Sequence, residues 1–390
     1  MELRILPFDY AVRNLGRSPV RLVATVLASA LVVCLVLAAA AFVRGMAESL
    51  VISSDRSNVI LMAAGSEESL ERSQIPVTSA TVVAADLPGL KTRLGVPYVS
   101  PEIHVALTVR TEPAGTEQYH AVVRGFAPEA FLVHSKVQMV EGRVPQPGKD
   151  ELMVGGLADT KMGLEPQSLQ VGRSLHFDNR SWKIVGRFQA PGTVMDAEVW
   201  VPLTDLQVAT KREGLSCLVV TLGDAEFDDV DAFTKQRFDL DLIAITESEY
   251  YAAVMRFYRP VRAMIWTTAI LIALAGLLGG LNTMYASFAS RVRELGTLQA
   301  LGYSRFAIVL SFVQEAMLTA SAGTLLGFVC CMLFIQGHAV RFSMGVFQLT
   351  IDHRVLLSGL VAGLIIGLIG ALPPAWRCLR FPIPEALRAS

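Results

Sequence analysis

Charged residues are scarce in this chain. Asp, Glu, Lys and Arg make up only 18% of its 390 residues, whereas 52% are hydrophobic and the mean hydropathy is +0.46. A soluble domain of this length normally carries more charge, so the composition excludes one. The composition indicates an integral membrane protein.

The sequence also lacks the short motifs of common enzymes and nucleotide-binding proteins. It contains no G-x-x-x-x-G-K-S/T phosphate loop, no H-E-x-x-H and no G-x-S-x-G. The histidines are not spaced like metal ligands. We therefore expect no catalytic residue, cofactor or metal on this chain, and any ATP must bind elsewhere. The six histidines are His104, His120, His134, His176, His338 and His353.

Cysteine is rare as well. Cys34, Cys330 and Cys331 lie in long apolar stretches and Cys378 lies just beyond the last one, which leaves Cys217 alone in the polar middle of the chain. No disulfide can form within that middle part. Because Cys217 lies in the apolar run SCLVV, we expect it to be a buried strand residue.

The sequence does contain long apolar runs. A hydrocarbon core of about 30 Å requires roughly 20 helical residues, and four runs reach that length. We predict spans at residues 22–43, 263–290, 305–336 and 355–376. The first is too long for an ordinary cleavable signal, so we expect it to remain as a span. The second exceeds the bilayer core and should tilt or project as a stalk.

Arginines cluster before the first predicted span, between the second and third spans, and after the fourth span. With four spans they all lie on one side, which the positive-inside rule makes cytoplasmic. Residues 44–262 and a short loop at 337–354 then lie outside, and both termini, including the tail at 377–390, lie inside. The arginines are Arg4, Arg13, Arg17, Arg21, Arg291, Arg293, Arg305, Arg377, Arg380 and Arg388.

The segment at residues 44–262 is large enough to fold as a separate domain. It carries 22 Lys and Arg against 29 Asp and Glu, a net charge of −7, so it lacks the basic surface that nucleic acid requires. Short apolar pieces between turns predict an α+β domain of two lobes, with a β-rich lobe inserted at about residues 118–210. We expect strands at 57–64, 104–110, 119–125, 217–222 and 240–245, further short strands within 137–206, and helices at 81–94 and 228–238.

Three features near or inside the spans suggest how these pack. Residues 1–21 place Leu6, Tyr10, Val12 and Leu15 among arginines, as in a helix on the inner membrane surface, although a plain extension fits too. Glu315 is a carboxylate inside a span, which favours a hydrogen-bonded packing residue over a proton relay. Glycines four residues apart predict close helix packing: Gly276, Gly280, Gly323, Gly327, Gly359, Gly363 and Gly367.

A short charged segment at residues 291–304 joins the second and third spans. Val292, Leu295, Leu298 and Leu301 recur every third residue and could form one apolar stripe of a helix that ends at Gly302. Arg293, Glu294, Thr297 and Gln299 remain for its other faces. Such a helix could contact a soluble partner, or it could be an ordinary structured loop.

This segment resembles the signature region of the FtsX/MacB-type permeases of ATP-binding-cassette (ABC) transporters. The family pattern R-E-I/L-G-x-x-x-A-L/V/I-G is matched by Arg293, Glu294, Leu295, Gly296, Ala300, Leu301 and Gly302, and a Glu-Ala pair follows at Glu315 and Ala316. The tail is similar to the closing motif of the family, with Cys378 in place of a small residue. That match comprises Pro374, Ala375, Pro384, Glu385, Ala386, Leu387 and Arg388.

The resemblance implies a non-catalytic permease subunit of the bacterial inner membrane. Residues 263–385 would form the FtsX-like permease domain, and residues 44–262 a MacB-like periplasmic domain. The expected partners are a cytoplasmic ATPase that binds ATP and Mg²⁺, a second permease copy or paralogue, and the lipid bilayer, while a membrane-fusion adaptor or another periplasmic protein stays open. The residues expected to couple to the ATPase are Arg291, Arg293, Glu294, Leu295, Gly296, Leu298, Ala300, Leu301 and Gly302.

Two functions share these motifs. In one, ATP hydrolysis moves the outer domain to export or extract a lipoprotein, lipid, peptide or drug-like substrate. In the other, the same movement regulates an extracytoplasmic enzyme such as a cell-wall hydrolase.

Overall fold

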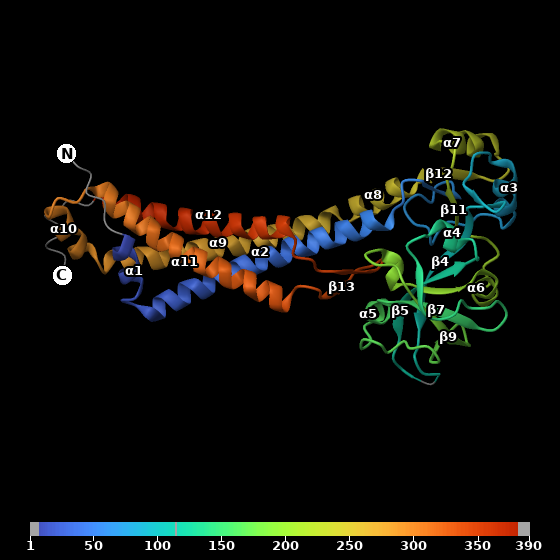
Figure 1. Ribbon diagram of the computed structural model, residues 1–390, viewed down its shortest axis with the longest axis horizontal. Coiled ribbons are helices and arrows are strands. Elements are labelled where there is room, and N and C mark those ends of the chain that lie inside the picture. The colour runs from blue at the N-terminus through green and yellow to red at the C-terminus, as the bar shows by residue number, and fades with distance from the viewer. Residues whose placement is uncertain (1–7, 114, 381–390) are drawn as a thin grey trace. The chain divides into compact units, whose positions relative to one another are not determined.

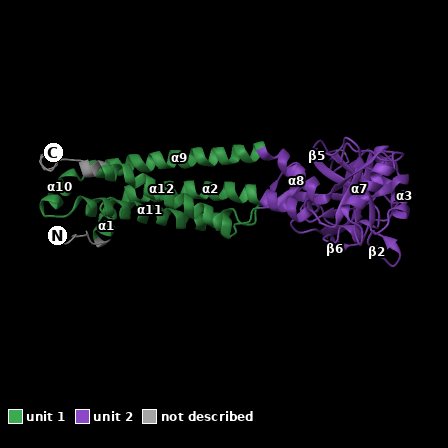
Figure 2. Ribbon diagram, turned by 90° about the horizontal axis from the view of Figure 1, so that it is seen from above, with its two compact units in different colours: residues 1–44, 260–338, 349–390 green, residues 45–259, 339–348 purple. Residues whose placement is uncertain are grey.

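The computed structural model describes residues 8–113 and 115–380. Its chain forms two compact units (Figure 2). The helical unit comprises residues 1–44, 260–338 and 349–390, and the α+β unit comprises residues 45–259 and 339–348.

The helical unit contains four helices that are long and apolar enough to cross a membrane. This confirms the predicted number of spans. Their bounds differ from the predicted windows most at α2, which continues ten residues beyond residue 43 into the α+β unit. The helices are α1 (Phe8–Leu15), α2 (Pro19–Ser53), α9 (Arg259–Ala289), α10 (Val292–Ala300), α11 (Arg305–Phe334) and α12 (His353–Arg380).

Glycines allow the spans to approach each other closely. A Cβ atom on Gly323 of α11 would lie 2.5 Å from Cβ of Ser29 on α2, and one on Gly359 of α12 would lie 2.6 Å from Cδ2 of Leu37 on α2. Because real Cβ contacts are almost never under 3.0 Å, larger residues would push these helices apart. Gly276, Gly327, Gly363 and Gly367 are equally confined.

Gly280 differs from the other six glycines. No atom of the described residues lies within 4 Å of a Cβ built there. The close packing predicted for Gly280 is therefore not seen among the described residues, where Gly280 instead lines a cavity shared with α2, α11 and α12.

The α+β unit is built on one long path of strands, in the order β12-β1-β11-β4-β5-β10-β7-β9-β6, with β8 paired to β9 (Figure 1). The strands are β1 (Asn58–Ala63), β4 (Val99–Val109), β5 (Tyr119–Phe126), β6 (Gln138–Gly142), β7 (Glu151–Gly155), β8 (Ser174–Phe177), β9 (Arg180–Gln189), β10 (Val199–Pro202), β11 (Cys217–Thr221) and β12 (Leu242–Thr246). The helices are α3 (Thr78–Asp86), α4 (Ala130–Val133), α5 (Ala158–Met162), η1 (Val194–Ala197), α6 (Leu203–Thr210), α7 (Phe227–Gln236) and α8 (Glu247–Phe257).

Strand β4 belongs to both halves of this path. Its residues 99–102 pair with β11, and its residues 103–109 pair with β5. One lobe therefore contains β1, β11 and β12, which come from both ends of the α+β unit, and the other contains the strands inserted between them. This is the two-lobed α+β arrangement that the sequence predicts.

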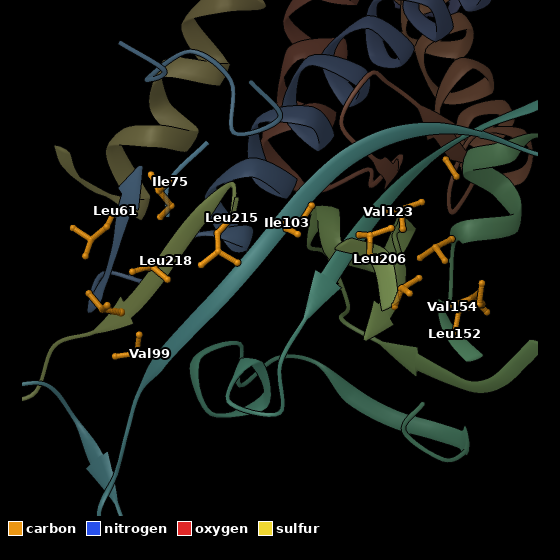
Figure 3. Packing of buried hydrophobic residues seen from close by; sticks show 14 of the residues in the cluster. Leu61, Ile75, Val99, Ile103, Val123, Leu152, Val154, Leu206, Leu215 and Leu218 are labelled. Atoms are coloured by element: carbon orange, nitrogen blue, oxygen red, sulfur yellow. The ribbon is translucent and has the colours of Figure 1, made fainter. Parts of the chain in front are cut away.

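A continuous apolar core runs through both lobes. Leu61 and Leu218 of one lobe and Val123 and Leu152 of the other belong to a single buried cluster (Figure 3). Strand β1 is buried on both faces, because its alternate residues enter two different clusters, Leu61 in this one and Ile60 in a second. The strand therefore appears in the sequence as an unbroken apolar run.

One local prediction was wrong, and another connection contains more structure than the sequence indicates. The helix predicted at 81–94 is α3 and ends at Asp86, because Pro88 disfavours helical geometry at Leu87. Residues 92–97 instead form the hairpin of β2 (Thr92–Arg93) and β3 (Val96–Pro97). The predicted loop at 337–354 contains a second hairpin, β13 (Ala339–Arg341) and β14 (Val346–Gln348), which is part of the α+β unit.

The glycine contacts predict a selective effect of bulk. Gly323→Leu should lower the stability of the helical unit by about 1–3 kcal/mol, because the new side chain overlaps α2. Thermal unfolding of the detergent-solubilised full chain would measure the change. Gly280→Leu is the matched control and should be nearly neutral in the isolated chain; equal destabilisation by both would contradict this account.

Candidate coupling site

Helix α10 lies between two of the spans and has well-defined ends. It begins after Arg291, and Gly302, just beyond its C-cap, has the left-handed φ of +90° that reverses the chain. The side chain of Ser304 then accepts a hydrogen bond from the backbone N–H of Ala307 and caps α11. A turn of only four residues, 301–304, therefore separates the two helices.

The inner face of α10 packs against α9 and α11. Leu295 is buried with Phe288 and Phe312 of the neighbouring helices, and Val292 and Leu298 pack against the same cluster. Leu301, predicted as the fourth residue of this apolar stripe, is 63% exposed. It follows the last residue of α10, so it no longer has the helical periodicity that places the other three inward.

The outer face of α10 is accessible. Arg293, Glu294, Thr297 and Ala300 are exposed, and Leu301 and Gly302 follow at the tip of the turn. Five of the nine residues expected to couple to an ATPase are exposed and available to a partner, namely Arg293, Glu294, Ala300, Leu301 and Gly302, and Leu298 is half-buried. Three are turned inward instead and are buried: Arg291, Leu295 and Gly296.

Arg291 makes a buried ion pair with Glu315 of α11. Its Nη1 and Nη2 atoms lie 2.9 and 3.3 Å from the two oxygens of the carboxylate, and the two residues are 7% and 5% exposed. The charge of Arg291 is therefore used inside the chain and is not exposed to a partner, and its role in coupling to an ATPase stays a prediction. Arg291 lies just outside the predicted spans, immediately before α10. The ionisable residues within the spans therefore did not include the partner of Glu315.

Helix α1 completes this arrangement. Asn14, which is 3% exposed, donates a hydrogen bond of 2.9 Å from Nδ2 to Glu315, and Ala11 is fully buried. Arg17, just beyond α1, forms an exposed ion pair of 2.9 Å with Glu294 on α10. The buried side of α1 thus contacts protein, whereas Val12 is 47% exposed and fits the expected membrane-surface face.

A cavity of about 240 Å³ adjoins the ion pair inside the helical unit. Residues of α2, α9, α11 and α12 line it, and most of the lining is apolar. Glu315 lies on its wall. The Glu315 carboxylate therefore lines an apolar cavity and also pairs with Arg291, the residue that precedes α10.

Part of the predicted site falls outside the described residues. Pro374 and Ala375 lie in α12, and Ala375 is buried in the same cluster as Leu295, whereas the other five residues of the closing motif lie beyond residue 380. Those residues are Pro384, Glu385, Ala386, Leu387 and Arg388.

One cluster of possible metal ligands occurs among the described residues, in the α+β unit. Donor atoms of Glu102, His104 and Cys217 all lie within 4.8 Å of one another. Sequence spacing did not reveal them, because two lie on β4 and the third lies on β11, which is more than 100 residues away in the sequence although it pairs with β4.

Comparison with protein families agrees with this architecture. A model described as the MacB-like periplasmic core domain matches residues 22–236, and one described as the FtsX-like permease C-terminal region matches residues 266–383. Together they cover both units of the chain.

Individual relatives are distant. The macrolide export ATP-binding/permease protein MacB of Shewanella sp. (strain W3-18-1) is 23% identical over 320 residues, which cover 79% of this chain and 49% of that protein. The uncharacterized ABC transporter permease YknZ of Bacillus subtilis (strain 168) is 22% identical over 354 residues, 86% of each chain. The periplasmic region of MacB from Actinobacillus actinomycetemcomitans has a TM-score of 0.39 at 10% identity, over 52% of this chain and 94% of that one. The chain spans about half the length of the MacB proteins it matches.

Four apolar helices and a two-lobed α+β unit between the first two define a multi-pass membrane protein of the permease class. With family models matching more than half of its length, the chain belongs to the FtsX/MacB-type permeases of ABC transporters.

The buried pair predicts an asymmetric response to mutation. Glu315→Gln leaves the guanidinium of Arg291 buried without a counter-charge, and loss of one partner of such a pair costs about 3–5 kcal/mol. The free energy of unfolding in detergent should fall accordingly. Glu294→Gln, which breaks the exposed pair with Arg17, should change it by only about 0–1 kcal/mol. Similar losses in the two variants would show that the buried contact is not the stronger one.

Proposed function

We propose that this chain is the non-catalytic membrane subunit of a bacterial ABC transporter, located in the inner membrane with both termini in the cytoplasm. A separate ATPase would bind ATP and Mg²⁺ and contact the exposed face of α10. Its movement would drive the α+β unit to export or extract a substrate such as a lipoprotein, lipid, peptide or drug-like molecule. The observation that carries this proposal is the exposed helix α10 fixed to the spans by a buried ion pair.

The contacts around α10 suit it to transmit movement. Only Ser290 and Arg291 separate it from α9, and the Arg291–Glu315 pair fixes its start to α11. The Arg17–Glu294 pair connects it to the segment between α1 and α2. A force on the outer face of α10 would therefore reach three spans through short connections.

Helix α9 supports the proposal of a second permease subunit. Only 6% of its most apolar window is buried within the chain. Large apolar side chains of α9 such as Ile270, Leu274 and Leu278 are exposed, so this helix has an apolar surface that another helix or lipid must cover. We propose that a second copy or a paralogue packs there and that lipid covers the rest of the surface.

The docking face can be tested by a charge exchange. In Glu294→Arg, the tagged full chain should retain less cellular ABC ATPase on affinity purification, because the docking surface has reversed its charge. Combining Glu294→Arg with Arg17→Glu restores the internal pair but keeps the reversed charge on α10. Binding should remain weak in this double variant, as measured by mass spectrometry of the retained ATPase.

Two results would contradict the proposal. One is a wild-type chain that retains no ABC ATPase. The other is full recovery of binding in the double variant, which would assign Glu294 to internal pairing alone. Crosslinking of the α+β unit in intact cells would separate export from regulation, because a trapped hydrolase would favour regulation.

A further inference from the structure

Two cysteines lie side by side in neighbouring spans. Sγ of Cys331 on α11 lies 3.3 Å from Sγ of Cys34 on α2 and 3.5 Å from the backbone oxygen of Cys34. The two residues are 297 positions apart in the sequence, so only the packing of the spans brings them together. A disulfide bond is about 2.0 Å long, and the two sulfurs therefore need to approach by only about 1.3 Å to form one.

Close packing of α2 against α11 holds the two thiols opposite each other. A Cβ built on Gly323 would lie 2.9 Å from the backbone oxygen of Val26. One built on Gly327 would lie 2.9 Å from the backbone oxygen of Ala30. Each step of four residues along α11 thus matches a step of four along α2, and residues four apart share one face of a helix. The next step in this register reaches the two cysteines.

The surroundings of the pair are apolar and differ between its two members. Cys331 is 1% exposed and is buried in a cluster with Val33 and Leu37 of α2. Cys34 is half-buried and packs against that cluster. Because both thiols lie within spans, a reagent must reach Cys34 from the membrane interior rather than from water. An ion is costly to bring there, so the reagent has to be lipid-soluble.

We propose that Cys34 and Cys331 form a site of reversible oxidation, at which a lipid-soluble hydroperoxide converts the two thiols into a disulfide. In the first step the sulfur of Cys34 attacks the terminal oxygen of the hydroperoxide and the O–O bond breaks. The departing alkoxide takes the thiol proton and leaves as an alcohol, and the sulfur becomes a sulfenic acid. In the second step the sulfur of Cys331 displaces the hydroxyl group, which leaves as water with the proton of the Cys331 thiol.

The difference in exposure assigns the two roles. The half-buried Cys34 can meet the hydroperoxide, whereas Cys331 is too deeply buried to react first. Cys331 instead lies against the sulfur that has just been oxidised. An accessible thiol beside a second, resolving thiol favours a disulfide over further oxidation.

The disulfide would join two spans that lead to different parts of the chain. Helix α2 continues into the α+β unit, and α11 follows α10 after a short turn. Because its ends are 297 residues apart, the bond restricts the unfolded chain and so stabilises the folded one. In the proposed function both spans carry movement, and oxidation would restrain one against the other. This last consequence rests on the proposed function, whereas formation of the disulfide does not.

The test uses the full chain, reconstituted in phospholipid vesicles and treated with cumene hydroperoxide. Free thiols are then blocked in detergent with N-ethylmaleimide, and a digest without reductant is analysed by mass spectrometry. We expect a linked pair of peptides that contain Cys34 and Cys331 and that dithiothreitol separates. The melting temperature of the chain should rise on oxidation and return on reduction.

Variants separate the two roles. In Cys331→Ser the oxidised Cys34 has no resolving thiol, so dimedone should trap it as the adduct of a sulfenic acid. In Cys34→Ser the buried Cys331 should stay unmodified. Cys330→Ser is the matched control, because it changes the neighbouring, half-buried thiol of α11, and it should form the linked pair in wild-type yield.

The monodisperse fraction of each variant is used, so that misfolded chains do not enter the comparison. A wild-type chain in which both thiols stay free after treatment would overturn the proposal. So would a linked pair that contains Cys330 in place of Cys331, a covalent dimer joined through Cys34, or modification of Cys331 in Cys34→Ser to the wild-type extent. None of these measurements involves an ATPase, so their failure would leave the proposed function standing.

Discussion

The ion pair between Arg291 and Glu315 constrains the whole helical unit around α10. Each charge is nearly inaccessible to solvent, so neither is stable there without the other. The pair connects the short segment between α9 and α10 to α11. Asn14 adds a third element, since its amide satisfies the same carboxylate. The exposed face of α10 is therefore presented by a rigid base, although its own residues are few and polar.

The α+β unit uses a related arrangement for a different purpose. Strand β4 changes its pairing partner from β11 to β5. Buried charges from both lobes meet at the point of that change. Arg124 bridges two carboxylates there, and Trp200 donates a hydrogen bond of 2.8 Å to one of them. Polar contacts have preferred directions, unlike apolar packing, so they define how two lobes with a shared core meet.

The two units differ in how much of their structure local sequence could reveal. Spans were predictable because lipid imposes one simple requirement, a run of apolar residues of sufficient length. Strands such as β1, β5 and β11 were predictable from short apolar runs between turns. The end of α3 and the hairpin at residues 92–97 were missed, since Pro88 and the left-handed Leu94 and Gly95 decide them rather than apolar periodicity.

The sequence by itself determined the number of spans, the two-lobed segment between the first two spans and the family motif on α10, because these depend on composition and on residues close together in the chain. Tertiary structure alone decided that Arg291 points inward to Glu315, that Leu301 is exposed, and that His104, His134 and Cys217 converge on Glu102. Those contacts join residues far apart in the sequence, and their formation depends on packing and on the cost of burying charge. A local sequence pattern determines neither the packing of distant residues nor the cost of burying their charges.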